Sequence, residues 1–159
     1  MSRYAKNTEV SVERSKAEIE QTLTRYGASQ FMSGWNQEKA YVAFSIFKRM
    51  ARFEIELPPK KDFIKTPGGK RDRSSEDVIK AWEQACRQTW RIMAFIIKAK
   101  LEAVETGVRT FEQEFLADVL LPNGATVGEY FKPVLEDAYK SKLMPPLQLP
   151  WKTETSKEM

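Results

Sequence analysis

The sequence predicts a single α+β domain over residues 1–150, in which a three-stranded antiparallel sheet packs on one long helix and further helices follow toward the C-terminus. Three observations carry this prediction. Apolar residues recur at helical spacing near both ends of the chain, a β-branched and alternating segment lies between them, and one uninterrupted helical pattern covers residues 75–106. The expected order of elements is α-βββ-α-α-α, with a polar tail over residues 151–159.

The first element is an amphipathic helix over residues 11–26. Ser11 has the side chain of a helix N-cap, apolar residues follow at helical spacing, and Gly27 is suited to end the helix. The preceding residues are polar and are expected to fray.

Three strands are expected next, over residues 31–35, 40–47 and 50–57. The run AYVAFSIF is rich in β-branched and aromatic residues, and FEIEL alternates apolar with charged side chains. Turns are predicted near Asn36-Gln37 and Lys48-Arg49. Neither turn holds the glycine of a tight hairpin, so the sequence leaves the register open.

A loop and a long helix occupy the middle of the chain. Residues 58–73, PPKKDFIKTPGGKRDR, contain three prolines and a Gly-Gly pair, which forbid regular structure. Ser74 and the acidic residues after it begin a helix that extends to the break at Gly107, and this helix is about 48 Å long at 1.5 Å per residue.

The C-terminal part holds two more predicted helices. Thr110 caps a short helix through Leu120, and Thr126 with Glu129 has the spacing of a capping box before a helix to about Lys142. The tail after this helix is interrupted by proline, and it is expected to lie on the surface through Leu147, Leu149 and Trp151.

The composition excludes several kinds of chemistry. The chain has no histidine and one cysteine, so imidazole triads, zinc sites, thiolate clusters and internal disulfides are all excluded within one chain. No strong motif for carboxylate, lysine, serine or tyrosine catalysis is present. We therefore predict a non-enzymatic protein without metal or cofactor.

The chain also has no apolar run near the ~20 residues of a membrane span, and its polar N-terminus MSRYAKNTEV lacks a signal peptide. The predicted location is cytoplasmic, and no membrane partner is expected.

Positive charge is concentrated in the loop over residues 58–73. This loop has six basic and two acidic residues, an excess equal to the net charge of +4 of the whole chain. Four further basic residues fall within about 40° of each other around the long helix. The predicted nucleic-acid-binding residues are Lys60, Lys61, Lys65, Lys70, Arg71 and Arg73 in the loop and Lys80, Arg87, Arg91 and Lys98 on the helix.

The long helix is expected to turn its apolar face to the sheet. The residues predicted to be buried there are Trp82, Cys86, Met93, Ile97 and Leu101, packed against Phe53, Ile55 and Leu57. Trp90 and Phe95 are assigned to the core by the same reasoning, and Cys86 is interpreted as a buried, inert thiol.

Several alternatives stay open beside the nucleic-acid hypothesis. The basic residues could form a solvated face or a surface for a protein partner. Glu54, Glu56 and Asp62 could hold Mg²⁺ in a nuclease site, and Tyr41 and Phe47 could stack bases on an open sheet face. The segment Pro67-Gly68-Gly69-Lys70 lacks the Walker spacing and is interpreted as a turn.

Three segments resemble a widespread family of small phage and prophage proteins. They are VSVERSKAEIEQTLTRYGASQFMSGW, KAWEQACRQTWRIMAFIIKAKLEAVETG and TFEQEFLADVLLPNGATVGEYF, and the similarity covers about residues 4–150. That family has no established activity, so the resemblance implies no functional residue. It implies a cytosolic protein made in a bacterial host.

The order of elements is also similar to the core of the phage single-strand annealing recombinases. Those proteins form rings or filaments and hold DNA along a basic groove between sheet and helix. No sequence motif of theirs is matched, so this similarity is one of topology only.

The leading hypothesis is therefore a phage-derived protein that binds single-stranded DNA in annealing or recombination. The alternative is a small phage protein that binds and modulates a host protein. Because a three-stranded sheet has two edges, a homo-oligomer is expected in either case, formed through an edge strand or through the apolar surface left beside the sheet.

Overall fold

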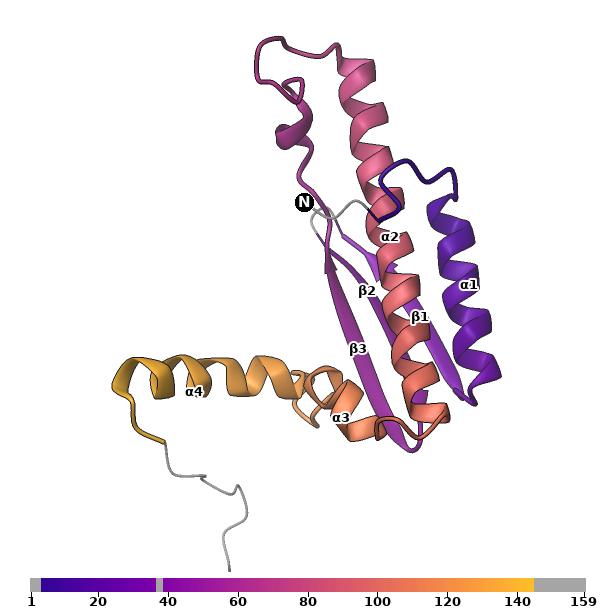
Figure 1. Ribbon diagram of the computed structural model, residues 1–159, viewed down its shortest axis with the longest axis vertical. Coiled ribbons are helices and arrows are strands. Elements are labelled where there is room, and N and C mark those ends of the chain that lie inside the picture. Colours follow the sequence, from indigo (N-terminus) through magenta and orange to yellow (C-terminus); the bar gives the residue numbers. More distant parts are fainter. Residues whose placement is uncertain (1–3, 37–38, 145–159) are drawn as a thin grey trace, which may run out of the picture.

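The computed structural model describes residues 4–36 and 39–144, and it confirms the predicted α+β class. The elements are α1 (Val12–Arg25), β1 (Gln30–Trp35), β2 (Lys39–Ile46), β3 (Arg49–Glu56), the 3-10 turn η1 (Lys60–Phe63), α2 (Ser75–Glu105), α3 (Phe111–Phe115), the 3-10 turn η2 (Leu116–Asp118) and α4 (Val127–Ser141). Helices α1 and α2 lie side by side on one face of the sheet, and α4 projects from the body (Figure 1).

The helices begin where the sequence signals predict. Ser11 and Ser74 accept hydrogen bonds from backbone N–H groups in the first turns of α1 and α2. Thr110 and Thr126 each form a complete capping box, with Gln113 before α3 and with Glu129 before α4. These bonds involve residues three apart in sequence, which is why they could be predicted locally.

The sheet has the order β1-β2-β3 and is antiparallel throughout. Its register pairs Val42 with Phe53 and Phe44 with Ala51, so the apolar residues of neighbouring strands share the face below the helices. The second hairpin turns at Phe47 and Lys48, both with positive φ, which is one residue earlier than predicted.

The core lies between the sheet and the helical layer. The buried line on α2 consists of Cys86, Trp90, Ala94, Ile97 and Leu101. Met93 is half-buried and packs against this core, so its predicted burial is confirmed only in part. The prediction was wrong for Trp82, which is half-buried and lies outside the core cluster. Trp82 lies one turn before Cys86, where its indole N–H reaches the carbonyl of Pro58 beyond the end of β3, so no strand covers it.

The assignment of Phe95 to the core was also wrong. Its side chain is 54% exposed, and its ring lies 5.0 Å from the ring of Tyr4 in the N-terminal segment. Phe95 follows the buried Ala94 by one residue, which is about 100° around the helix, so it points away from the buried line.

The loop over residues 58–73 is more ordered than predicted. Its first half forms η1, and Lys65 pairs with Asp72 in an isolated β-bridge. The backbone N–H of Arg73 donates to the carbonyl of Ile64 at 2.7 Å. The two prolines before η1 do not prevent this turn, because each precedes the residues that form it.

The predicted helix through Leu120 is also wrong in its length. Helix α3 ends at Phe115, and Val119 then pairs with Ala51 of β3 while the Leu120 N–H donates to the Met50 carbonyl at 2.7 Å. Phe115 is fully buried, and this anchor turns the chain back along β3. The edge of β3 that was expected to be open is therefore partly paired.

The tail residues Leu147, Leu149 and Trp151 lie outside the described residues. Within the described part of the chain, none of the helices combines the length and the apolar character needed to cross a bilayer.

Candidate functional site

Two adjoining cavities lie where α2 runs past the end of the sheet. One has a volume of about 450 Å³ and lies between the start of α1, α2 and the end of β1. The other, of about 750 Å³, lies between the end of β1, the segment after β3 and η1. Both are lined by Trp35, Leu57 and Trp82, and Trp90 lines the first. We call this site the tryptophan groove, defined by these four residues.

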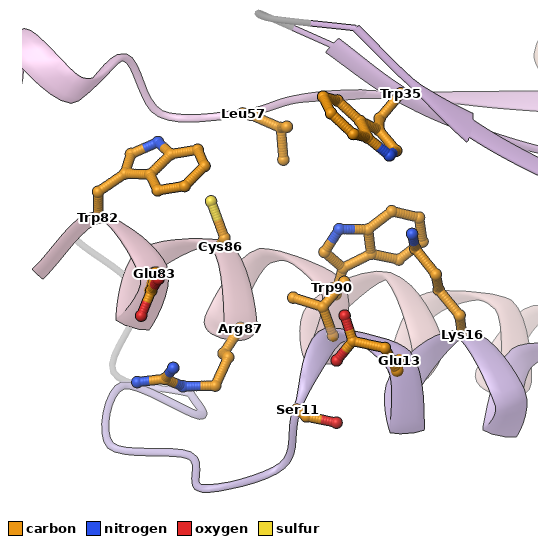
Figure 2. A pocket seen from close by; sticks show the side chains of 11 residues that line it. Ser11, Glu13, Lys16, Trp35, Leu57, Trp82, Glu83, Cys86, Arg87 and Trp90 are labelled. Carbon is orange, nitrogen blue, oxygen red and sulfur yellow. The ribbon is translucent and has the colours of Figure 1, made fainter. Parts of the chain in front are cut away.

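The side chains of α2 point across the groove toward the sheet. Figure 2 shows Trp82, Cys86 and Trp90 projecting from the helix toward Leu57 and Trp35. Trp35 is the last residue of β1, pairs with Ala40, and is 71% exposed. Trp90 is buried and forms the floor of the groove. An exposed indole thus stands opposite a buried one, with room for a flat group beside them.

Cationic side chains lie against these rings. The Lys16 ammonium is 4.8 Å from the centre of the Trp90 ring, and the Lys60 ammonium is 4.5 Å from that of Trp82. Arg87 also lines the groove, where its guanidinium donates to the side-chain oxygen of Gln84. An ammonium group held over an aromatic ring keeps its N–H donors. Lys16 and Lys60 can therefore still donate to an anionic ligand in the groove.

Acidic residues line the same groove. Glu13 and Glu83 lie beside the first cavity, together with Lys16 and Arg87, so that cavity is balanced in charge. The second cavity has Lys39, Lys60 and Lys61 against Glu56. Because Lys39 is paired with Glu54, the surplus of positive charge lies with the two η1 lysines.

Cys86 lies in the groove wall. Burial raises the pKa of its thiol, with a further raising effect from the nearby Glu83 carboxylate. The thiol is therefore protonated at neutral pH and is a poor nucleophile.

The predicted basic residues of the loop fall into three groups. Lys60 and Lys61 line the groove, while Lys65, Lys70 and Arg71 are exposed farther along the loop. The Arg73 guanidinium instead donates to the carbonyls of Phe63 and Lys65, at 2.9 and 2.7 Å. Arg73 thus holds the loop together rather than facing outward.

The predicted basic stripe of the long helix is divided by neighbouring segments. Lys80 pairs with Glu76, and Arg91 with Glu18 of α1, whose carboxylate raises the pKa of the arginine. Lys98 is exposed and lies about 27 Å from Lys80 along the helix axis. Of the four residues, Arg87 is the one that the structure brings into the groove.

The N-terminal segment lies along the same side of α2. The Gln84 amide donates to the carbonyls of Lys6 and Thr8, and the Gln88 amide donates to that of Tyr4. These contacts hold the N-terminal segment against Gln84 and Gln88, on either side of Arg87.

The other candidates from the sequence lie elsewhere. Tyr41 lies on the sheet face opposite the helices, and Phe47 lies in the hairpin turn against the Phe111 ring. Glu54 pairs with Lys39. Among residues 4–36 and 39–144, no group of three or more acidic or cysteine side chains gathers in a way that could hold a metal ion.

Sequence reasoning missed the groove itself. Trp82 and Trp90 were assigned to the core, and Trp35 and Lys16 were not singled out. Trp35 was recognisable as the last residue of a predicted strand. That three tryptophans far apart in sequence line one groove could not be recognised, because it depends on how α2 packs against the sheet.

Comparison with models of known protein families, with curated proteins and with solved structures finds no match to this chain. The resemblance to phage proteins therefore stays a prediction.

Proposed function

We propose that this chain is a phage-derived, non-enzymatic protein that binds single-stranded DNA, with bases in the tryptophan groove and phosphates on the lysines of η1 and the loop. The observation that carries the proposal is the exposed Trp35 ring opposite Trp82 and Trp90, in a groove whose open end is bordered by Lys60 and Lys61. Proteins that bind single strands combine aromatic stacking platforms with cationic grooves in this way.

Two physical contributions support sequence-tolerant binding. Every base has a π-face, and stacking on an aromatic side chain contributes about 1–3 kcal/mol per base. Phosphate contacts with lysine and arginine release counterions and are insensitive to sequence. Lys65, Lys70 and Arg71 extend the positive surface along the loop beyond the groove. We infer a role in strand annealing or recombination, which needs binding without sequence preference.

The test measures the affinity of a fluorescent oligothymidine by anisotropy at two salt concentrations. Trp35→Ala removes an exposed ring and is expected to weaken binding about 5- to 150-fold, the equivalent of the stacking of one base. Lys60→Ser with Lys61→Ser is expected to weaken binding and to make the slope of log K against log salt shallower by about 0.7 for each phosphate that is no longer neutralised.

Lys132→Ser with Lys140→Ser is the matched control, because it removes the same charge from α4 and leaves the groove intact. The control is expected to bind nearly as well as the parent. Equal losses of affinity in the two double variants would mean that net charge alone drives binding. Absence of parental binding at low salt would overturn the proposal.

A host-protein ligand is the second candidate, and the carboxylates in the groove favour it. Glu13, Glu83 and Glu56 repel phosphate but can pair with basic groups of a peptide, while the tryptophans accept its apolar side chains. This candidate predicts no oligonucleotide binding at physiological salt, and a cross-link from a photoreactive residue at position 35 to one host protein.

A further inference from the structure

Helix α4 has an apolar face that nothing covers in the described part of the chain. No residue of α4 is buried, and the helix projects from the sheet (Figure 1). Val127, Phe131, Val134 and Ala138 follow the spacing i, i+4, i+7, i+11, which places them in one line along the helix. Tyr130 and Leu135 border this line, and the charged residues of α4 lie mostly on the opposite side. We call this line with its two bordering residues the α4 face.

A second uncovered apolar surface is the sheet face opposite α1 and α2, which we call the open sheet face. Met32, Tyr41 and Met50 are exposed there around a hollow of about 450 Å³, with Ala43 and Leu120 among its other lining residues. The Tyr41 ring lies directly over Gly34, where an added Cβ would overlap it, so the ring packs against the neighbouring strand β1.

Most charged side chains of the open sheet face are paired within the chain. Lys39 pairs with Glu54, and the Arg52 guanidinium reaches the carboxylate of Glu129 at 3.1 Å. Glu56 is exposed at the end of β3, opposite Lys39. An apolar partner can therefore cover the centre of this face, around Tyr41 and Ala43, and leave Glu56 at its border in contact with solvent.

Contacts at the start of α4 prevent the helix from covering the open sheet face of its own chain. A Cβ at Gly128 would lie 2.9 Å from the Ala117 carbonyl oxygen, so the first turn of α4 packs directly against η2. Arg52 also donates to the Gly124 carbonyl just before α4. Folding α4 back over its own sheet would break these contacts, so α4 does not cover the open sheet face of its own chain.

We propose that two copies of this chain associate by exchanging α4, so that the α4 face of each copy lies on the open sheet face of the other. The 15 residues of α4 extend about 22 Å, and the 8-residue strands β2 and β3 extend about 26 Å, so the helix fits within the sheet. A two-fold axis relates the two contacts, and each copy contributes the same two surfaces.

Both surfaces still expose large apolar side chains that a dimer would remove from water. On α4, Tyr130 is 52%, Phe131 39% and Leu135 58% exposed, and on the open sheet face Met32 is 57% and Tyr41 41% exposed. The exchange makes this contact twice, and specific interfaces bury about 1,600 Å² in total. This proposal is independent of the nucleic-acid proposal, since it uses the opposite face of the sheet.

The first test is the molar mass in solution, measured by light scattering and sedimentation up to several hundred micromolar. The parent is expected to be a dimer, and Val134→Asp with Leu135→Asp is expected to be a monomer with an unchanged circular dichroism spectrum. Lys132→Ser with Lys140→Ser changes the polar side of the same helix and is expected to stay dimeric. A monomeric parent, or a dimer that survives both aspartates, would overturn the proposal.

The second test identifies the two surfaces by cysteine cross-linking. In a Cys86→Ala background, chains carrying Leu135→Cys are mixed with chains carrying Met32→Cys, Tyr41→Cys or Met50→Cys and are mildly oxidised. We expect a disulfide-linked heterodimer in at least one of the three mixtures. If Leu135→Cys chains form disulfide-linked homodimers and none of the three mixtures gives a heterodimer, α4 pairs with α4 and the proposed exchange is wrong.

Discussion

Ile97 is the residue on which the packing of α2 depends most directly. It is fully buried within the cluster formed by α1, the sheet, α2 and α3. Ile97→Ala is expected to lower the free energy of unfolding by about 2–5 kcal/mol, because it removes buried methyl groups and leaves a cavity. Denaturant unfolding followed by circular dichroism measures this change.

Ile79 on the same helix provides the matched comparison. It is 48% exposed, so Ile79→Ala is expected to cost less than about 0.5–1 kcal/mol. Equal costs at the two positions would mean that α2 is rotated from the orientation described.

Glu129 is expected to make stability depend on pH. Its pKa lies below the usual value, first because the backbone N–H of Thr126 donates to its carboxylate and also because Arg52 is near. A lowered pKa means that the stabilisation is present above the pKa of the unfolded state and is lost as the pH falls through the folded value.

The comparison of the parent with Glu129→Gln isolates this effect. We expect the parent to be more stable at pH 7 by less than about 1 kcal/mol, since the Glu129 carboxylate is 44% exposed and solvent screens the pair. The difference should shrink as the pH falls below about 4.5. A difference in stability that stays constant between neutral and acidic pH would contradict this role of Glu129.

The capping box of Glu129 with Thr126 could be predicted from the sequence, because the two residues are three apart. Its partner Arg52 could not be predicted, because it lies far away in sequence.

At the scale of elements, the loop after β3 differs from its prediction, because regular structure was not expected there. Arg73 donates to two loop carbonyls, and Arg73→Ser is expected to speed amide hydrogen exchange over residues 60–72 by about fivefold or more through loss of charge-assisted hydrogen bonds. Lys70→Ser removes the same charge from an exposed position and should leave exchange unchanged. Similar exchange in both variants would show that Arg73 does not hold the loop.

The loop also shows which part of an element can be predicted. Its basic composition and its position before α2 follow from the sequence. The sequence alone could not separate Arg73 from its neighbours, because all six basic residues have the same long-range charge. Only the carbonyls placed by η1 and by the Lys65–Asp72 bridge give Arg73 a structural role.

At the scale of the whole molecule, the proposed exchange of α4 would link folding to association. Mass action then requires the melting temperature of the parent to rise with protein concentration, because the folded state is the one that dimerises. The Val134→Asp, Leu135→Asp variant is expected to melt at a temperature independent of concentration. Differential scanning calorimetry over a wide range of concentration measures both. A parental melting temperature that does not move with concentration would count against a dimer.

The helix starts, the strands and the long helix were determined by the sequence itself. Caps at Ser11, Ser74 and Thr126 act over three residues, and apolar periodicity depends only on the repeat of each element. Such signals are local, so they can be recognised without knowledge of the fold. The concentration of positive charge in the loop is likewise a property of composition.

The tertiary structure alone decided the contacts between segments that are distant in sequence. Trp35, Trp82 and Trp90 line one groove because α2 runs past the end of β1. The stripe on α2 is divided because Glu18 and the N-terminal carbonyls lie along it. The start of α4 lies so close to η2 that a Cβ at Gly128 would meet the Ala117 carbonyl oxygen. Each of these depends on how two elements pack, and packing depends on shape and distance in space, which neither periodicity nor composition encodes.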